Sequence, residues 1–159
     1  MVTDRRHQHS ENQPHYRHLF VMAVLSFASM YVLMYAMVNV FADVYNNVNQ
    51  VYMAGLMTAP MIVIELVVMR AMYADRLANV VIGSVAIAVG IACFVSIRQQ
   101  TTVSDRQFLR SMIPHHGGAI LMCREANLTD PDLQRLCTTI IASQQAEIDQ
   151  MKAKLRQLE

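Results

Sequence analysis

Three long apolar runs constrain this chain most strongly, and they cover residues 19–40, 51–69 and 78–97. A helix needs roughly 20 apolar residues to cross ~30 Å of hydrocarbon at about 1.5 Å per residue. Apolar side chains make up 54% of the 159 residues, which is high for a soluble protein. We therefore predict three transmembrane helices in contact with membrane lipid, forming a unit over residues 19–97.

The distribution of basic residues predicts how these helices are oriented. Three arginines lie in residues 1–18 and two lie between the second and third runs, whereas residues 41–50 contain no Lys or Arg. The positive-inside rule then places residues 1–18, expected to be a disordered tail, in the cytoplasm. Three spans export the chain after residue 97, which in a bacterium is the periplasmic side of the inner membrane. Three exported arginines run against this bias: Arg98, Arg106 and Arg110.

The C-terminal part of the chain, residues 105–159, changes to the period of an amphipathic helix. Apolar residues recur there every three or four positions in two segments, which are separated by the turn sequence NLTDPD. Thr129 or Asp130 can cap a helix that begins with Pro131 at its first position. After a linker over residues 98–104, we predict an antiparallel helical hairpin, and hence an all-α fold class for the whole chain.

A hairpin of this size is expected to need a partner. About 55 residues remove too little apolar surface from water to be stable alone. Two hairpins form a four-helix bundle, the simplest closed arrangement that covers two apolar stripes. We therefore predict a homo-oligomer, most simply a dimer, formed through the C-terminal hairpin.

The hairpin also carries a candidate metal site. On its first helix, four side chains of ligand type fall at offsets 0, 3, 4 and 10, on or beside one face. The second helix folds back and brings two more opposite the histidine pair. Thioethers suit Cu(I), while imidazole binds copper in either oxidation state and also zinc. The predicted metal is copper, with Cu(I) favoured and zinc possible. Spacing places Met112, His115, His116 and Met122, with Cys123 beside them, on the first helix, and Glu147 and Met151 on the second.

Three residues that weaken helices surround the histidine pair. Pro114 removes a backbone donor inside the predicted helix, at a cost of ~3 kcal/mol. Gly117 and Gly118 each cost roughly 1 kcal/mol relative to Ala, and they allow a partner backbone or a ligand to approach closely. Their presence favours a site over a simple packing stripe.

Two motifs in this region are similar to those of a known family. The run MIPHHGGAILM at residues 112–122 and the later run QQAEIDQM at residues 144–151 resemble the family called domain of unknown function 305. The resemblance covers residues 105–158. It implies a ferritin-like helical bundle that is often exported, and some relatives are copper-binding proteins linked to metal tolerance. Carried over by position, the resemblance implies six ligands: Met112, His115, His116, Met122, Glu147 and Met151.

The sequence leaves several alternatives open. The histidine pair can be a solvent-facing doublet, and the methionines can simply fill gaps in the core. Cys123 and Cys137 lie on either side of the turn, at distances that differ by about one helical turn. This offset disfavours a disulfide, and the two thiols are alternatively soft ligands. Glu65, near the cytoplasmic end of the second run, is expected to snorkel or to pair with Arg70.

These observations favour a membrane-anchored metal-binding protein that sequesters copper or hands it to a copper-handling partner protein on the periplasmic side. The alternative is a structural or oligomerisation module of a membrane complex with no metal role. An oxidase of the ferritin-like type needs several core carboxylates with a Glu-x-x-His pairing, which this hairpin lacks, so we do not expect an enzyme. The net charge of +1 and the absence of a basic stripe predict no binding to nucleic acid.

Overall fold

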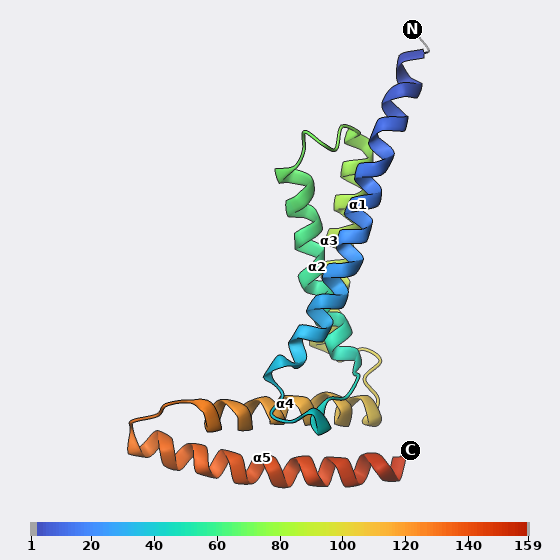
Figure 1. The fold of residues 1–159 in the computed structure, drawn as a ribbon. Coiled ribbons are helices and arrows are strands. Elements are labelled where there is room, and N and C mark those ends of the chain that lie inside the picture. The colour runs from blue at the N-terminus through green and yellow to red at the C-terminus, as the bar shows by residue number, and fades with distance from the viewer. Residues whose placement is uncertain (1–2, 159) are drawn as a thin grey trace. The chain divides into compact units, whose positions relative to one another are not determined.

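The computed structural model describes the backbone of residues 3–158 and the side chains of residues 15–158. The chain is helical, and no strand occurs between residues 3 and 158 (Figure 1). Two short 3-10 helices, η1 (Met34–Met37) and η2 (Phe41–Asp43), precede α2. The predicted all-α class is therefore confirmed. The α-helices are α1 (Thr3–Leu33), α2 (Val48–Val68), α3 (Arg76–Gln99), α4 (Asp105–Glu125) and α5 (Pro131–Leu158).

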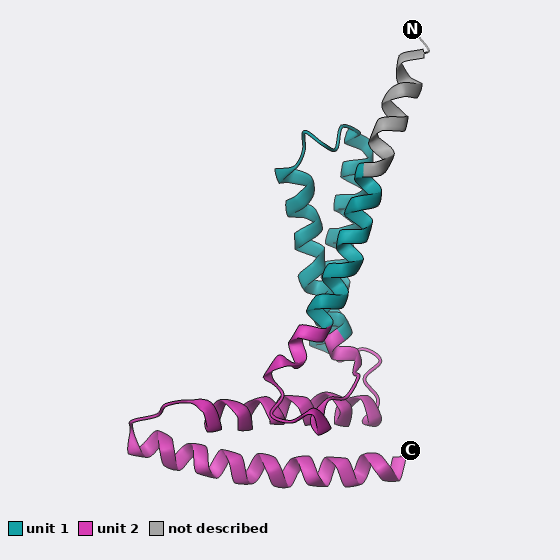
Figure 2. Ribbon diagram, viewed as in Figure 1, with its two compact units in different colours: residues 1–31, 51–99 teal, residues 32–50, 100–159 magenta. Residues whose placement is uncertain are grey.

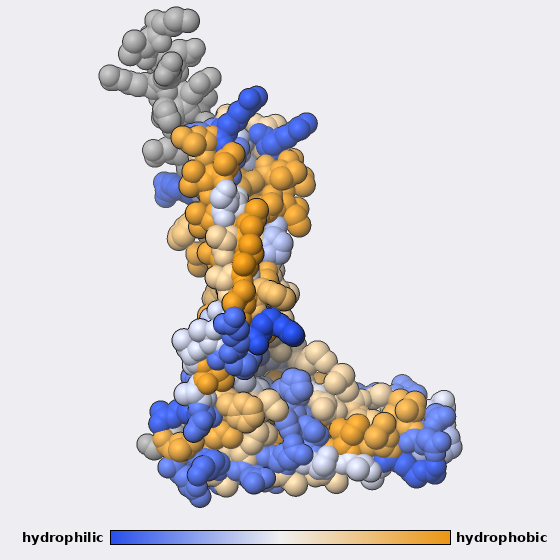
Figure 3. All heavy atoms as spheres, turned by 180° about the vertical axis from the view of Figure 1, so that it is seen from behind, coloured by the Kyte–Doolittle hydropathy of each residue, from blue (hydrophilic) through white to orange (hydrophobic). Residues whose placement is uncertain are grey.

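Three stretches are long and apolar enough to cross a membrane: His15–Met37, Val48–Val68 and Arg76–Gln99. Each agrees with a predicted span to within four residues at either end. The tail predicted over residues 1–18 overlaps the start of α1, which begins at Thr3, and the side chains before residue 15 are not described, so its disorder stays a prediction. On the face seen in Figure 3, apolar side chains cover these helices, as expected of surfaces that meet lipid.

The chain divides into two compact units (Figure 2). Unit 1 contains residues 1–31 and 51–99, and unit 2 contains residues 32–50 and 100–159. Residues 32–50, which lie inside the predicted membrane unit (residues 19–97), therefore belong to unit 2 in the structure. Hydropathy could not reveal this, because the segment packs against α4 through contacts between residues far apart in the sequence.

In unit 1, small residues lie where α2 and α3 approach closely. A Cβ atom added to Gly90 of α3 would lie 3.1 Å from the Cβ of Ala59 in α2. One added to Gly55 of α2 would lie 2.8 Å from Sγ of Cys93 in α3. Helices in lipid associate by such close packing, since burial from water does not drive them together.

Glu65 lies in α2 and has a partner other than the predicted one. The hydroxyl of Tyr73 donates a hydrogen bond to Oε1 of Glu65 over 3.4 Å. Burial raises the pKa of Tyr73, and the nearby negative charge of Glu65 raises it further. The expected partner Arg70 is exposed. Because a phenol stays neutral at ordinary pH, this contact solvates the carboxyl group without neutralising its charge.

Polar side chains begin the helices as the sequence suggests. Oδ1 of Asp130 accepts hydrogen bonds from the backbone N–H groups of Asp132 and Leu133, at 2.8 and 3.0 Å. This confirms Asp130 rather than Thr129 as the cap of α5. Asn47 caps α2 in the same way, because its Oδ1 accepts the N–H of Gln50 over 3.0 Å.

In unit 2, α4 and α5 pack along one another and run in opposite directions (Figure 1). Three fully buried isoleucines, Ile113, Ile120 and Ile148, form the centre of their contact. Leu109 and Leu155 extend this cluster, and Tyr45 from the segment between α1 and α2 packs against it. The apolar stripes predicted for these two helices therefore meet each other within one chain.

A disulfide joins Cys123 of α4 to Cys137 of α5, with Cα atoms 5.2 Å apart. The expectation against this bond was wrong. It assumed that both helices end at the same level, whereas α4 ends at Glu125 and Ala126 is extended, with φ −72° and ψ 128°. The extended chain carries the start of α5 beyond the end of α4, so that a residue further into α5 lies opposite Cys123.

This pairing predicts the reactivity of the thiols. In protein purified without reductant and then denatured, a thiol reagent is expected to label Cys93 alone, and to label all three cysteines after reduction. Reduction is expected to lower the free energy of unfolding by about 3 kcal/mol, the contribution of a cross-link that closes a loop of this length. In the control variant Cys93→Ser, the reagent should label no cysteine before reduction. Three labelled cysteines without reductant would contradict the pairing.

Candidate metal centre

His116 is the buried member of the histidine pair. Its exposed fraction is 6%, and it lies on the side of α4 that faces α5. Nδ1 lies 2.9 Å from the backbone oxygen of Met112, one turn earlier in α4. Nε2 lies 2.7 Å from Oε2 of Glu147 in α5. Both ring nitrogens are thus engaged, one by the helix itself and one across the helix contact.

The partners of His116 fix where its protons lie. A carbonyl oxygen only accepts hydrogen bonds, so Nδ1 carries a hydrogen and donates it to Met112. The second contact then holds one proton between Nε2 and the carboxyl group of Glu147. A metal ion that binds Nε2 must replace this proton. The side chain of Glu147 is 52% exposed, so it can move aside or join the ligand set without disturbing the core.

His115 occupies a different environment. It lies one residue before His116, about 100° around the helix axis, and it is exposed. Its ring centroid lies 6.0 Å from that of His116. The two rings are tilted by 63°. The structure therefore brings His116 and Glu147 into contact, and it places His115 at the rim of the same contact.

The three predicted methionine ligands differ in their distance from this pair. Met112 is half-buried one turn before His116, and Met151 lies one turn after Glu147, where it packs against the apolar core. Met122 is 55% exposed and six residues after His116, about 9 Å further along the axis at 1.5 Å per residue. Because the helices run in opposite directions, Met112 and Met151 both lie one turn from the pair toward the start of α4, while a role for Met122 as a ligand stays a prediction.

His116 and Glu147 alone do not complete a metal site in the described part of one chain. Among the described residues, no three His, Cys, Asp or Glu side chains lie close enough to hold one ion. His116 and Glu147 supply one nitrogen and one carboxylate ligand. Further ligands must come from methionine sulfur, from His115 after rotation, or from a second copy of the chain.

The opposite side of α4 seats the segment that precedes α2. A Cβ atom added to Gly117 would lie 3.5 Å from the backbone nitrogen of Asn39 and equally far from Oδ2 of Asp43. One added to Gly118 would lie 3.4 Å from the backbone oxygen of Met37. These are ordinary van der Waals distances, so a segment of the same chain packs against both glycines, while the predicted close approach of a partner backbone or a ligand stays a prediction.

Asp43 and Lys152 form an ion pair that the sequence did not reveal. Asp43 is 2% exposed, and Lys152 of α5 contacts its Oδ1. The pair ties the segment before α2 to α5. The adjacent glycines were the available signal, but they do not tell which segment approaches them.

The comparisons with known proteins agree with the motifs. Residues 95–155 match the family described as Domain of unknown function (DUF305). An uncharacterized protein of Acanthamoeba polyphaga mimivirus is 34% identical over 140 residues, which cover 86% of this chain and 90% of that protein. The chain belongs to the domain of unknown function 305 family. No solved structure matches it. Since the aligned stretch is longer than the family match, the likeness to the viral protein extends into the helices that are apolar enough to cross a membrane.

The contact across the helices predicts a difference between the two histidines. His116→Ala leaves a buried space beside Glu147 and is expected to lower the free energy of unfolding by about 1–3 kcal/mol. The matched control His115→Ala removes an exposed ring and should change it by less than about 0.5 kcal/mol. Unfolding of the full chain in detergent measures both, and equal effects would contradict the assigned environments.

Proposed function

We propose that this protein is a membrane-anchored metal-binding protein that sequesters copper or hands it over on the periplasmic side of a bacterial inner membrane. The observation that carries the proposal is the engagement of His116 by a backbone carbonyl at Nδ1 and by Glu147 at Nε2. In metal-binding histidines one ring nitrogen characteristically donates to a carbonyl or carboxylate, which fixes the tautomer and turns the other nitrogen toward the metal.

The proposed ligand set is centred on this pair. Nε2 of His116 and the carboxylate of Glu147 bind the ion, and Met112 and Met151 add sulfur from the neighbouring turns. His115 completes the set from the rim. Sulfur favours Cu(I), whereas the nitrogen and carboxylate ligands alone also suit zinc. Bound there, the ion would be held for storage or transfer, and we assign no catalysed reaction.

Two further observations support an exported, paired α4–α5 unit. Disulfides such as Cys123–Cys137 persist in oxidising compartments, which supports a periplasmic location for α4 and α5 and a cytoplasmic N-terminus. Large apolar side chains also stay exposed on this unit, and a second copy would cover them in a ferritin-like four-helix bundle. These side chains are Phe108, Met122, Leu133 and Leu136.

The second candidate function is a structural or oligomerisation module without a metal. One observation favours it: both ring nitrogens of His116 already have hydrogen-bond partners. A buried histidine satisfied in this way can serve only to fix the register of α4 against α5. The two functions differ in one measurable property, which is whether the full chain retains copper.

Titration of the full chain in detergent with Cu(I) under reducing conditions tests the proposal. Wild-type protein is expected to bind stoichiometric copper, and the double variant His115→Ala/His116→Ala should lose about 100-fold or more in affinity. Met112→Leu should weaken Cu(I) more than Cu(II), because the softer ion gains more from sulfur.

The matched control is His18→Ala, which removes an exposed histidine from α1 and should leave the affinity unchanged. Circular dichroism verifies that each variant keeps its helices. Unchanged Cu(I) affinity in the helical double-histidine variant would reject the histidine pair as the binding site, and wild-type protein that retains no copper would leave the structural module.

A further inference from the structure

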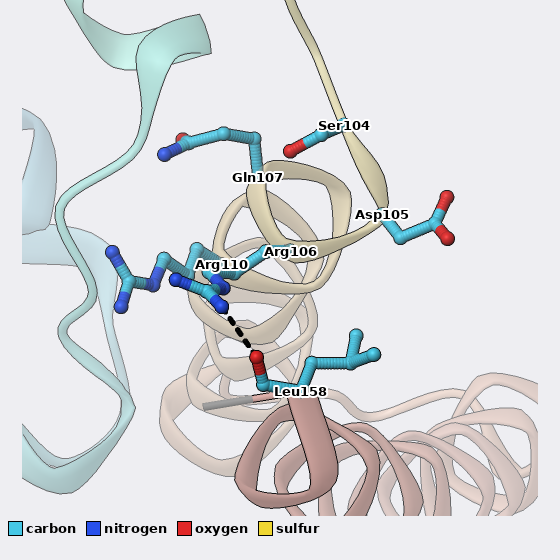
Figure 4. Close-up of a pocket in the computed structure, with 6 residues that line it drawn as sticks. All are labelled: Ser104, Asp105, Arg106, Gln107, Arg110 and Leu158. Carbon is cyan, nitrogen blue, oxygen red and sulfur yellow. Dashed lines mark hydrogen bonds between the residues drawn. The ribbon is translucent and has the colours of Figure 1, made fainter.

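A cavity that is wide open to solvent, with two arginines among its lining residues, lies at the start of α4 (Figure 4). Its volume is about 640 Å³, and every residue that lines it belongs to unit 2. The guanidinium groups of Arg106 and Arg110 extend from the same side of the helix, whereas Asp105 is directed away from both. The lining consists of Ser104, Asp105, Arg106, Gln107, Arg110 and Leu158.

The groups at this cavity are suited to an anion. Arg106 donates one hydrogen bond to the backbone oxygen of Leu158, and a guanidinium group has five donors in all. Oε1 of Gln107 accepts the N–H of Val48 over 3.0 Å. The side-chain NH2 group of Gln107 can donate to a ligand. The first backbone N–H groups of α4 add a favourable dipole. Arginine binds phosphate oxygens in pairs, which makes phosphate the anion that fits best.

The position of the cavity along the chain indicates where such a phosphate is found. Only residues 100–104 separate α3, an apolar helix able to span a membrane, from α4. An extended chain covers at most ~3.6 Å per residue, so α4 begins within about 20 Å of the end of α3 however unit 2 is oriented. Phospholipid headgroups fill the zone just outside the hydrocarbon. Arg106 and Arg110 run against the positive-inside bias, and contact with headgroup phosphates would explain their presence on the exported side.

We propose that this cavity binds a phosphate group, supplied by the headgroup of an anionic phospholipid or by free phosphate. The site is separate from His116 and Glu147 and does not depend on a metal function. Arg106 and Arg110 supply the charge and the paired donors, and the start of α4 supplies backbone N–H groups. A bound headgroup would hold the start of α4 at the membrane surface.

Calorimetric titration of the full chain, held in nanodiscs of phosphatidylcholine, tests this site. The probes are dihexanoyl phosphatidylglycerol, inorganic phosphate, and dihexanoylglycerol, which has the same acyl chains but no phosphate. Wild-type protein is expected to bind dihexanoyl phosphatidylglycerol more tightly than dihexanoylglycerol. The double variant Arg106→Gln/Arg110→Gln should lose about tenfold or more in affinity for dihexanoyl phosphatidylglycerol. Arg135→Gln, a control at an exposed arginine of α5, should bind like wild type.

The three probes also identify the source of the phosphate. Binding of both phosphate-bearing probes identifies the phosphate group itself as the ligand, and binding of phosphatidylglycerol alone identifies a lipid site. Each single variant is measured as well, with its fold verified by circular dichroism, in case the double variant does not fold. Equal binding of dihexanoylglycerol, or unchanged binding in the folded single variants, would overturn the proposal.

Discussion

Ile113, Ile120 and Ile148 are fully buried between α4 and α5, and the polar groups of unit 2 take their positions from this packing. Each such side chain contributes roughly 1.5–3 kcal/mol by leaving water. Their contact sets the register of the helices, and that register brings Glu147 to Nε2 of His116. A shift of α5 by one residue would turn Glu147 by about 100° and separate the pair. The apolar contact therefore determines whether a site exists at all.

Two sides of α4 contact different segments of unit 2. One side, with His116 and Met112, faces α5 and presents nitrogen, oxygen and sulfur groups at the edge of the core. The other side has no side chain at Gly117 and Gly118, and it receives the segment that precedes α2. Asp43 in that segment also forms an ion pair with Lys152 of α5, so the segment contacts both α4 and α5. Residues that weaken a helix are acceptable here because the surrounding contacts compensate.

Much of this could be predicted from the sequence, because hydropathy and period act locally. The three apolar helices, the cap at Asp130 and the contact of α4 with the region around Glu147 follow from residue spacing. The disulfide could not be predicted, since its geometry depends on the extended conformation of Ala126 after α4. Neither could the ion pair of Asp43 with Lys152, because it joins segments that are separated in the sequence by α2, α3 and α4. Helical spacing placed both histidines on one face, but a step of 100° buries His116 and exposes His115.

The proposed metal function depends on which atoms surround the ion, and X-ray absorption spectroscopy of the Cu(I)-loaded full chain measures this directly. The account predicts a mixed first shell, with imidazole nitrogen near 2.0 Å and sulfur near 2.3 Å as rough distances. It also predicts that the imidazole signal falls in His116→Ala, while His18→Ala keeps it. A shell made of sulfur alone, or a spectrum that His116→Ala leaves unchanged, would contradict the assignment of His116 as the central ligand.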